Sequence, residues 1–298
     1  MRGPIWWFGG KGQMVAKLLP LMPPCRRYCE PFCGAASMFF ARDPVEVETL
    51  NDLDGGLIGF FRALADPEQF ERFYRRVALL PYSRELYDEA RLRWRNEGDP
   101  VERAVYWFIV ARQSFGGLFA HSWGSVVTNS RRGRAATVNS WLSCIDGLPE
   151  IHARLQGAQI ENADWRIVLD RYDTPETLMY CDPPYVASTR SDGGYAHEMT
   201  VGDHGELVAA LLRLKGTAVV SGYDHPVYAP LTDAGWAKYG FATACHSVGK
   251  TRGSGLQGKG AALANAPRTE IVWVTPWGHG ENDLFSRTSP TLNLEGID

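Results

Sequence analysis

Apolar positions recur with two different periods along the chain, and these periods divide it into three parts. In the first part, residues 1–58, short apolar runs between glycines predict one helix and two strands. In the second part, residues 59–160, apolar residues recur at spacings of three and four, which indicates amphipathic helices. The segments expected here are a helix at 14–21, strands at 26–32 and 45–52, and helices at 57–64, 68–80, 85–96 and 100–115.

The third part, residues 161–298, alternates strand-like and helix-like segments. Strands are expected at 177–185, 217–228 and 268–276, and a helix at 205–216. Strand, helix and strand with short connections are typical of a largely parallel sheet covered by helices. If the strands of 1–58 join this sheet, one α/β domain is split between 1–58 and 161–298, and 59–160 is a helical insertion. The polar stretch 125–139 predicts an exposed loop or hairpin.

Length and composition favour a soluble protein. The 298 residues are 45% hydrophobic, enough for one large core or two smaller ones. The longest apolar run has eight residues, whereas a membrane helix needs roughly 20. The first residues, MRGPIWWFGGKGQ, lack the apolar centre of a signal peptide. We therefore expect a cytoplasmic protein.

The six cysteines do not predict disulfides or a metal site. Cys25, Cys29 and Cys33 are spaced by four, but proline and glycine interrupt any helix there and no CxxC pair or nearby histidine completes a ligand set. HEMT at 197–200 lacks the second histidine of HExxH. Buried, reduced thiols and no bound metal are expected.

Charge is distributed unevenly along the chain. The net charge is −3, yet the window 72–134 contains twelve arginines, no lysine and six acids, a net of +6. The remainder of the chain carries −9. An arginine-rich segment in an acidic chain fits contact with nucleic-acid phosphates, although a solvated helix surface is the alternative.

Four short stretches place glycines, acids and aromatics at the ends of predicted elements: WWFGGKGQ, YCEPFCGAASMFF, TLNDLD and YCDPPY. The first offers close backbone approach and a cation, or is simply a flexible turn. The second leads from a strand through a glycine turn into a helix start, which suits nucleotide binding, although a tight turn fits equally well. Asp52 lies 18 residues after Gly34, where an acid can accept hydrogen bonds from ribose. For Asp54 a helix N-cap is the strong alternative.

The fourth stretch suits recognition of an amine on a flat heterocycle. Asp182 offers acceptor oxygens, and Pro183 and Pro184 have fixed φ and no N–H, so that the intervening carbonyls point in preset directions. Tyr185 adds a flat ring. A carboxylate and a carbonyl together accept both N–H bonds of an exocyclic amine. The alternative is a loop in which Asp182 caps a neighbour and Tyr185 is half buried.

Together with SGYDHPVY, these motifs resemble the D12 class of DNA adenine-N6 methyltransferases, which includes the Dam methylases. Their order is that of the alpha arrangement, with target recognition between the glycine motif and DPPY, and the resemblance covers nearly the whole chain. It implies a Rossmann-like methyltransferase fold that uses S-adenosylmethionine, yields S-adenosylhomocysteine and needs no metal. It also implies double-stranded DNA as substrate, no partner protein, and a bacterial restriction-modification or phage setting.

The resemblance assigns roles to individual residues. Those expected at the cofactor are Trp7, Lys11, Phe32, Gly34, Asp52 and Asp182. Those expected to hold the flipped adenine for catalysis are Asp182, Pro183, Pro184 and Tyr185. One departure stands out, because the family commonly has Phe-x-Gly-x-Gly where this chain reads FCGAA, with Ala36 at the second glycine. We expect a slightly altered turn and an active enzyme.

ARQSFGGLFAHSW resembles the family's Asn-Arg-x-x-(Phe/Tyr)-Asn-Gly stretch, which leads into a DNA-contacting hairpin, although Ala111 and Gly116 replace the two asparagines. Arg112 is either part of this contact or a buried structural partner. The glycine-rich C-terminal segment is a second candidate DNA contact, or an inert loop. The DNA-binding candidates are Phe119, His121, Trp123, Arg131, Arg132, Lys250 and Arg252.

The implied reaction is direct, in-line transfer of a methyl group to N6 of an adenine that has left the duplex stack. Three alternatives stay open: a cytosine-N4 enzyme with the same clamp, an RNA adenine methyltransferase, and a catalytically silent DNA-binding protein. A nicotinamide oxidoreductase is disfavoured because GxGxxG is missing.

Overall fold

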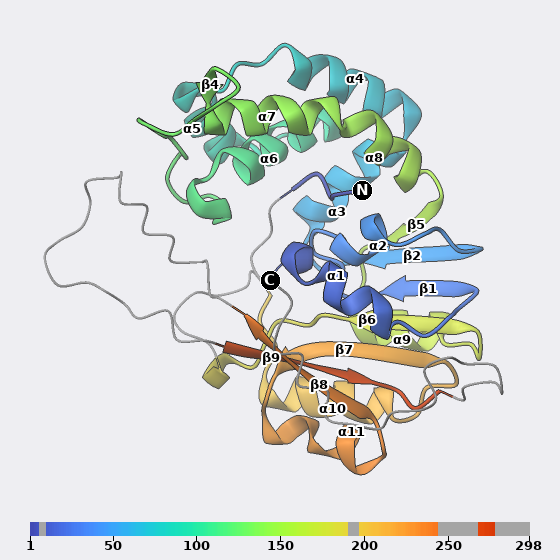
Figure 1. The fold of residues 1–298 in the computed structure, drawn as a ribbon. Coiled ribbons are helices and arrows are strands. Elements are labelled where there is room, and N and C mark those ends of the chain that lie inside the picture. Colours follow the sequence, from blue (N-terminus) through green and yellow to red (C-terminus); the bar gives the residue numbers. More distant parts are fainter. Residues whose placement is uncertain (6–9, 190–196, 244–267, 278–298) are drawn as a thin grey trace, which may run out of the picture.

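The computed structural model describes residues 1–5, 10–189, 197–243 and 268–277, which contain one seven-stranded sheet with helices on both faces (Figure 1). The strand order is β5-β2-β1-β6-β7-β9-β8. The first five strands in this order (β5, β2, β1, β6 and β7) are parallel to one another. Strand β9 runs antiparallel to both of its neighbours, β7 and β8. The strands are β1 (Arg27–Glu30), β2 (Val47–Asn51), β5 (Ala158–Glu161), β6 (Thr177–Cys181), β7 (Thr217–Tyr223), β8 (Ala237–Thr243) and β9 (Arg268–Val274). The predicted α/β, Rossmann-like fold is confirmed.

The order of the strands creates a point where the chain reverses direction across the sheet. From β1 the chain moves outward to β2 and β5, and it then returns to place β6 on the other side of β1. Strand β6 is buried at all five positions, as expected for a central parallel strand. Ligands of open α/β sheets bind beyond the carboxyl ends of the strands at such a point. The fold therefore directs attention to the residues that follow β1 and β6.

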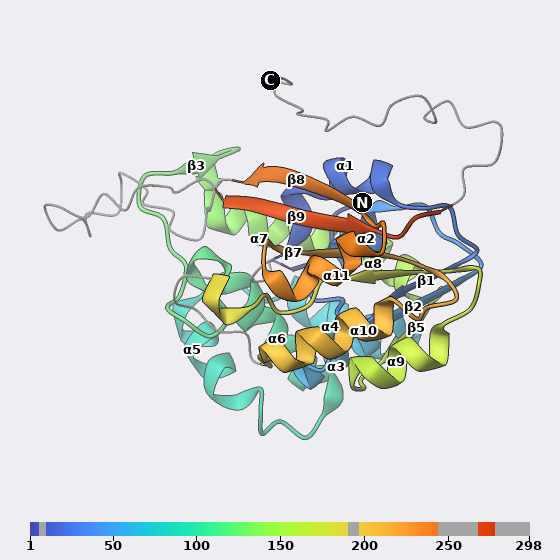
Figure 2. The same ribbon diagram turned by 90° about the horizontal axis from the view of Figure 1, so that it is seen from below.

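Two hydrophobic cores lie on the two faces of the sheet. One is formed with α9 (Trp165–Tyr172), α10 (Val201–Leu211) and α11 (Ala229–Asp233). Helices α10 and α11 lie below β7 in Figure 1, and Figure 2 shows the three helices next to one another. The other joins the sheet to α2 (Ser37–Ala41) and to the helices of the middle segment. No helix in the described part of the chain is long and apolar enough to cross a bilayer.

Helix α6 forms the centre of the middle segment. Its N-cap Asp99 accepts hydrogen bonds from two backbone N–H groups, and ten of its fourteen residues are buried. The Phe60 ring of α3 stacks on Trp107 and Phe108 of α6 at centroid distances of 5.0 and 5.5 Å. The helices are α3 (Gly55–Ala65), α4 (Pro67–Ala78), α5 (Arg84–Arg93), α6 (Pro100–Gln113), α7 (Ala136–Asp146) and α8 (Leu148–Leu155).

The middle segment shares its core with the sheet. The core that contains Phe60 and Phe108 also contains Leu50 of β2 and Leu178 of β6. The boundaries expected at 58/59 and 160/161 fall within α3 and within β5. The division between catalysis and recognition therefore concerns the roles of the segments, and it remains a proposal.

Several elements differ from the expectation. The helix expected at 14–21 consists of α1 (Val15–Leu18) between two 3-10 turns, because Pro20 has no N–H to continue an α-helix. The polar stretch does form a hairpin, β3 (Ser130–Arg131) and β4 (Arg134–Ala135), but its last four residues begin α7. Strands β5 and β8 and helix α9 were not predicted.

The five described cysteines are free thiols. Cys29 and Cys33 are buried, as expected, whereas Cys25 is half-buried. No group of three or more His, Cys, Asp or Glu residues is placed to hold a metal within the described ranges.

Two glycines of α3 offer a test of how tightly the middle segment packs on the rest. A Cβ on Gly56 would lie 2.7 Å from Nε1 of buried Trp107 and 2.9 Å from the Trp94 ring, whereas one on Gly59 would meet nothing within 4 Å. We expect Gly56→Ala to lower the free energy of unfolding by about 1–3 kcal/mol. Gly59→Ala should raise it by about 0.5–1 kcal/mol, because alanine favours the helix. Urea unfolding of both variants measures this, and equal effects would contradict the packing.

Candidate active site

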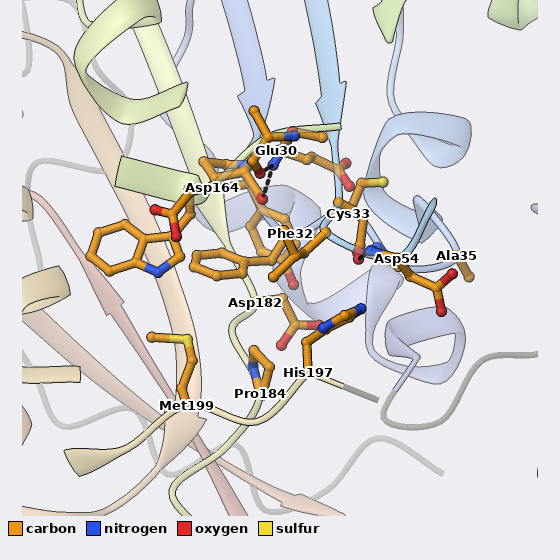
Figure 3. A pocket seen from close by; sticks show the side chains of 18 of the residues that line it. Glu30, Phe32, Cys33, Ala35, Asp54, Asp164, Asp182, Pro184, His197 and Met199 are labelled. Atoms are coloured by element: carbon orange, nitrogen blue, oxygen red, sulfur yellow. Dashed lines mark hydrogen bonds between the residues drawn. The ribbon is translucent and has the colours of Figure 1, made fainter. Parts of the chain in front are cut away.

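A cleft opens at the switch point of the sheet, between the ends of β1 and β6 (Figure 3). Its lining side chains come from the turn at Lys11, from the glycine turn after β1, from the acidic segment after β2, from α9 and from the DPPY turn after β6. Sequence reasoning expected six of its lining residues, namely Lys11, Phe32, Gly34, Asp52, Asp182 and Pro184. The main lining residues are Lys11, Glu30, Phe32, Gly34, Asp52, Asp164, Trp165, Tyr180, Asp182, Pro184, His197 and Met199.

The glycine turn after β1 holds Asp52 in place. Gly34 has a φ of +46°, and its N–H donates to Oδ2 of Asp52 at 2.9 Å. The N–H of Asp54 donates to Oδ1 of the same carboxylate at 3.0 Å. Burial raises the pKa of Asp52 despite these bonds. Each oxygen keeps a lone pair that can accept from a hydroxyl in the cleft, and Asp54 is the N-cap of α3.

Ala36 adopts the conformation that explains why the family has glycine there. Its φ is +51° and ψ is +38°, in the left-handed region, and its methyl group is buried. Left-handed backbone costs a residue with a side chain about 1–2 kcal/mol. Burial of the methyl group contributes about 0.8 kcal/mol in the opposite direction. The two contributions partly offset each other, so alanine is tolerated in this left-handed turn, and the slight alteration of the turn that we expected stays a prediction.

Asp182 and Tyr185 lie just after the end of β6, and both contact Lys11. The Lys11 Nζ lies 2.7 Å from Oδ1 of Asp182 and also contacts the Tyr185 hydroxyl. The hydroxyl donates to Oε1 of Glu270 on β9 at 2.9 Å, and Lys11 Nζ lies 3.1 Å from the same oxygen. Burial raises the pKa of Asp182 to about 6, with Lys11 opposing the rise and Glu270 adding to it. The Tyr185 ring packs edge-on against Tyr223, at 4.8 Å.

Glu30, the last residue of β1, is a buried acid that the sequence motifs left without a role. Its Oε1 accepts from the Tyr28 hydroxyl and from the Phe39 N–H, both at 2.8 Å. Burial raises the pKa of Glu30 to about 8, in spite of these two hydrogen bonds and with a further rise from Asp182. The strand-end position of the glutamate in EPF was the signal that could have identified it.

An aromatic corner closes one side of the cleft. The Phe32 and Trp165 rings lie 6.0 Å apart at 36°, and Met199 lies beside them (Figure 3). Asp164, the N-cap of α9, also lines the cleft. Phe32 was expected, whereas Asp164 and Trp165 were missed because α9 was not predicted. This corner fits the face and edge of a flat heterocycle.

Carboxylates dominate the charge of the cleft. Besides Glu30, the acids Asp52, Asp54, Asp164, Asp182, Glu198 and Asp203 line it, and the basic residues that line it are Lys11, Arg166 and His197. An acidic, partly desolvated cleft favours a ligand that carries positive charge. The acids and the aromatic corner together match a nucleoside attached to a cationic group.

The residues expected at DNA occupy different environments. Phe119 packs inward on Trp94 and Trp107, at centroid distances of 5.6 and 5.4 Å. Trp123 is half-buried and donates from Nε1 to Oε1 of Gln113 at 3.1 Å, whereas His121 is exposed.

Arg131 and Arg132 are exposed on the β3–β4 hairpin. Arg112 is half-buried and donates to the backbone and hydroxyl oxygens of Ser140 on α7, which is the structural alternative. Trp7, Lys250 and Arg252 lie outside the described residues.

The sequence matches the family of D12 class N6 adenine-specific DNA methyltransferases over residues 7–233. The chain belongs to this family. It is a DNA adenine methyltransferase, and the matched range contains the cleft residues from Lys11 to Asp203. The family is described by its adenine target and by DNA, which favours the adenine prediction over the cytosine and RNA alternatives.

Two similar proteins carry related names. The DNA adenine methylase of Vibrio cholerae serotype O1 is 26% identical over 197 residues, which cover 64% of this chain and 68% of that protein. The Type II methyltransferase M.CviBI of Paramecium bursaria Chlorella virus NC1A is 25% identical over 197 residues, 65% of this chain and 73% of that protein. Both names describe methyltransferases, in agreement with the family.

The buried acids of the cleft make stability depend on pH. Glu30 ionises at about 4.3 in an unfolded chain and at about 8 in the fold, so the fold binds more protons between these values. The free energy of unfolding should therefore fall as pH rises from 5 to 8. Asp182, raised to about 6, acts in the same direction. Glu30→Gln should flatten the decline, because glutamine does not ionise in this pH range. Its Oε1 can still accept both hydrogen bonds, so the local structure is kept.

Urea unfolding of the ligand-free protein between pH 5 and 8.5 measures this dependence. Glu176→Gln is a suitable control, because Glu176 pairs with Arg26 at the surface. Parallel curves for wild type and Glu30→Gln would show that Glu30 does not carry the effect.

Proposed function

We propose that this methyltransferase transfers a methyl group from S-adenosylmethionine to N6 of an adenine flipped out of double-stranded DNA. The observation that carries the proposal is the position of Asp182. It follows β6 at the switch point, next to the acidic cleft and beside Tyr185. A carboxylate there can accept from an exocyclic amine while a cationic methyl donor lies in the cleft.

The donor set of the cleft fits S-adenosylmethionine. Asp52 would accept from the ribose hydroxyls, because Gly34 and Asp54 already fix its carboxylate. Phe32 and Trp165 would enclose the adenine of the cofactor, with Asp164 at its edge. When bound, the cofactor supplies a sulfonium-activated methyl group that is transferred directly to the target amine. Lys11 would orient Asp182 at this site.

Asp182 would be the main residue that orients the target amine. Its carboxylate accepts one amine N–H, and the backbone carbonyl of the DPPY turn accepts the other, so the nitrogen lone pair points at the methyl group. Pro183 and Pro184 keep the turn rigid. Tyr185 would bound the plane of the base. Orientation and hydrogen bonding supply the catalysis, and the amine proton leaves to solvent after transfer.

The middle segment, 59–160, would recognise the DNA, and 1–58 with 161–298 would catalyse. The exposed Arg131 and Arg132 of the hairpin suit phosphate contacts. His121 and Trp123 lie on the loop before this hairpin, and Phe119 would have to leave its packing to wedge the duplex. Trp7 would contact the cofactor. Lys250 and Arg252 would contact the phosphates of the DNA backbone. We place the enzyme in a bacterial cytoplasm, acting without a partner protein.

Long-read sequencing of DNA from a methylation-free bacterial host that expresses the chain tests the reaction. The wild type should modify adenine within one short recurring sequence. Asp182→Ala should reduce methylation by at least a factor of about 100, because a preorganised hydrogen-bond acceptor is lost. It should still bind S-adenosylmethionine in calorimetry. Asp170→Ala, an exposed acid of α9, is the control. Modified cytosines, or full activity of Asp182→Ala, would overturn the assignment.

The hairpin arginines should contribute to DNA binding through their charge, with little dependence on the DNA sequence. Replacing both Arg131 and Arg132 by glutamine should weaken binding to any duplex and reduce the slope of log affinity against log salt by about 2. Fluorescence anisotropy with a labelled duplex at several salt concentrations measures the slope. Arg26→Gln serves as control, since Arg26 is exposed but paired with Glu46 and Glu176. An unchanged slope in the hairpin variant would exclude these phosphate contacts.

A further inference from the structure

Glu270 reaches the active site from an unexpected direction. It lies on β9, outside every motif that carries the family resemblance, and only 9% of its side chain is exposed. Its Oε1 accepts from the Tyr185 hydroxyl at 2.9 Å and lies 3.1 Å from the Lys11 ammonium. Lys11 in turn lies 2.7 Å from Asp182. One buried cation is thus shared between two carboxylates from strands on different sides of β7.

We infer that Glu270 is a positioning residue that anchors Lys11 and the Tyr185 hydroxyl and thereby sets the charge on Asp182. The inference rests on the proposed function, in which ionised Asp182 accepts from the target amine. Glu270 would not touch the base or the cofactor, since it acts through Lys11 and Tyr185.

The sharing of Lys11 explains how Glu270 can control Asp182. Glu270 repels negative charge on Asp182 directly, and it also draws the ammonium toward itself. Without the charge on Glu270, the Lys11 ammonium would be drawn more strongly toward Asp182, and the ionised form of Asp182 would be favoured. Glutamine at 270 removes the charge, and its amide oxygen can still accept from Tyr185. The substitution therefore separates charge from geometry.

Other groups face Asp182 as well, and they stay unchanged in this comparison. Glu30 and Tyr180 lie behind it on β1 and β6, and both interact electrostatically with it. His197 also lines the cleft and lies beside Asp182 in the view of Figure 3. A change in the titration of Asp182 between wild type and Glu270→Gln is therefore attributable to position 270 and to the response of Lys11.

The first measurement is the pH dependence of single-turnover methylation, with the duplex whose sequence the genomic experiment identifies. The wild-type rate should rise with pH as Asp182 ionises, at a pH set by the complex with the cofactor. In Glu270→Gln this rise should move to lower pH by about one unit, and in Lys11→Met to higher pH by about one unit. In the double variant, Lys11→Met with Glu270→Gln, the rate should rise at lower pH than in Lys11→Met alone. The reason is that Asp182 then no longer faces the negative charge of Glu270.

A second measurement needs no DNA and no turnover. S-adenosylmethionine and S-adenosylhomocysteine differ by a methyl group and one positive charge, so the ratio of their affinities reports negative charge in the cleft. In both proteins the preference for the cationic form should increase with pH as Asp182 ionises, and calorimetry between pH 5 and 8 should find this increase at lower pH in Glu270→Gln than in wild type. The missing charge at position 270 changes the ratio itself at every pH, so the position of the increase along the pH axis is the measured quantity.

Glu48→Gln is the matched control. Glu48 is another buried acid of the same sheet, on β2, and is ion-paired with Arg154. Its replacement should lower stability without moving either pH profile. If Glu270→Gln behaves like Glu48→Gln, or if the double variant equals Lys11→Met, Glu270 is structural only and the inference is overturned. A wild type that binds cofactor but methylates no DNA overturns the proposed function, while the affinity ratio still tests Glu270. Binding of neither cofactor form overturns both.

Discussion

The placement of one buried ammonium constrains much of this structure. Lys11 belongs to a short turn near the N-terminus, yet it is only 5% exposed and lies against acids that follow β6 and lie within β9. A buried charge without partners costs several kcal/mol. The N-terminal turn, the central strand and a late antiparallel strand must therefore meet at one point. That requirement brings the DPPY turn into the cleft with its carboxylate already held.

The rest of the cleft follows from the topology of the sheet. The reversal between β1 and β6 leaves Glu30 and Asp182 at neighbouring strand ends, with Asp52 at the next strand. Three acids at one sheet edge would repel one another in an empty pocket, and burial raises the pKa of each. A cationic ligand relieves this repulsion. The repulsion between the acids is therefore greater in the empty site than in the site with a bound cation. This suits a methyl donor that loses its positive charge when it reacts.

Much of the site was predictable because its motifs are local. Lys11, Phe32, Gly34, Asp52 and Asp182 each stand in a short stretch at a strand end, and all of them line the cleft. Glu270 could not be found this way, because its role depends on the pairing of β9 with β7, 47 or more residues apart in sequence. Phe119 illustrates the converse, since its neighbours Trp94 and Trp107 belong to other helices and turn it inward.

The fold was predictable where strands are central and apolar, as in β6. It was not predictable at the margins, where β5 carries the polar sequence AQIE and its partner is β2 alone. Helix α7 was missed because it begins inside a polar stretch that also forms the hairpin.

The position of β9 has a consequence for synthesis of the chain on the ribosome. Strand β9 lies between β7 and β8, although among the described residues it is the last strand to be translated. Until residue 274 has emerged, β7 presents an unpaired edge and β8 has no neighbour to join. Exposed edges invite pairing with other chains. Copies that stop before β9 lack Glu270 and leave the edge of β7 unpaired, so they should be the copies most prone to aggregate and most in need of a chaperone.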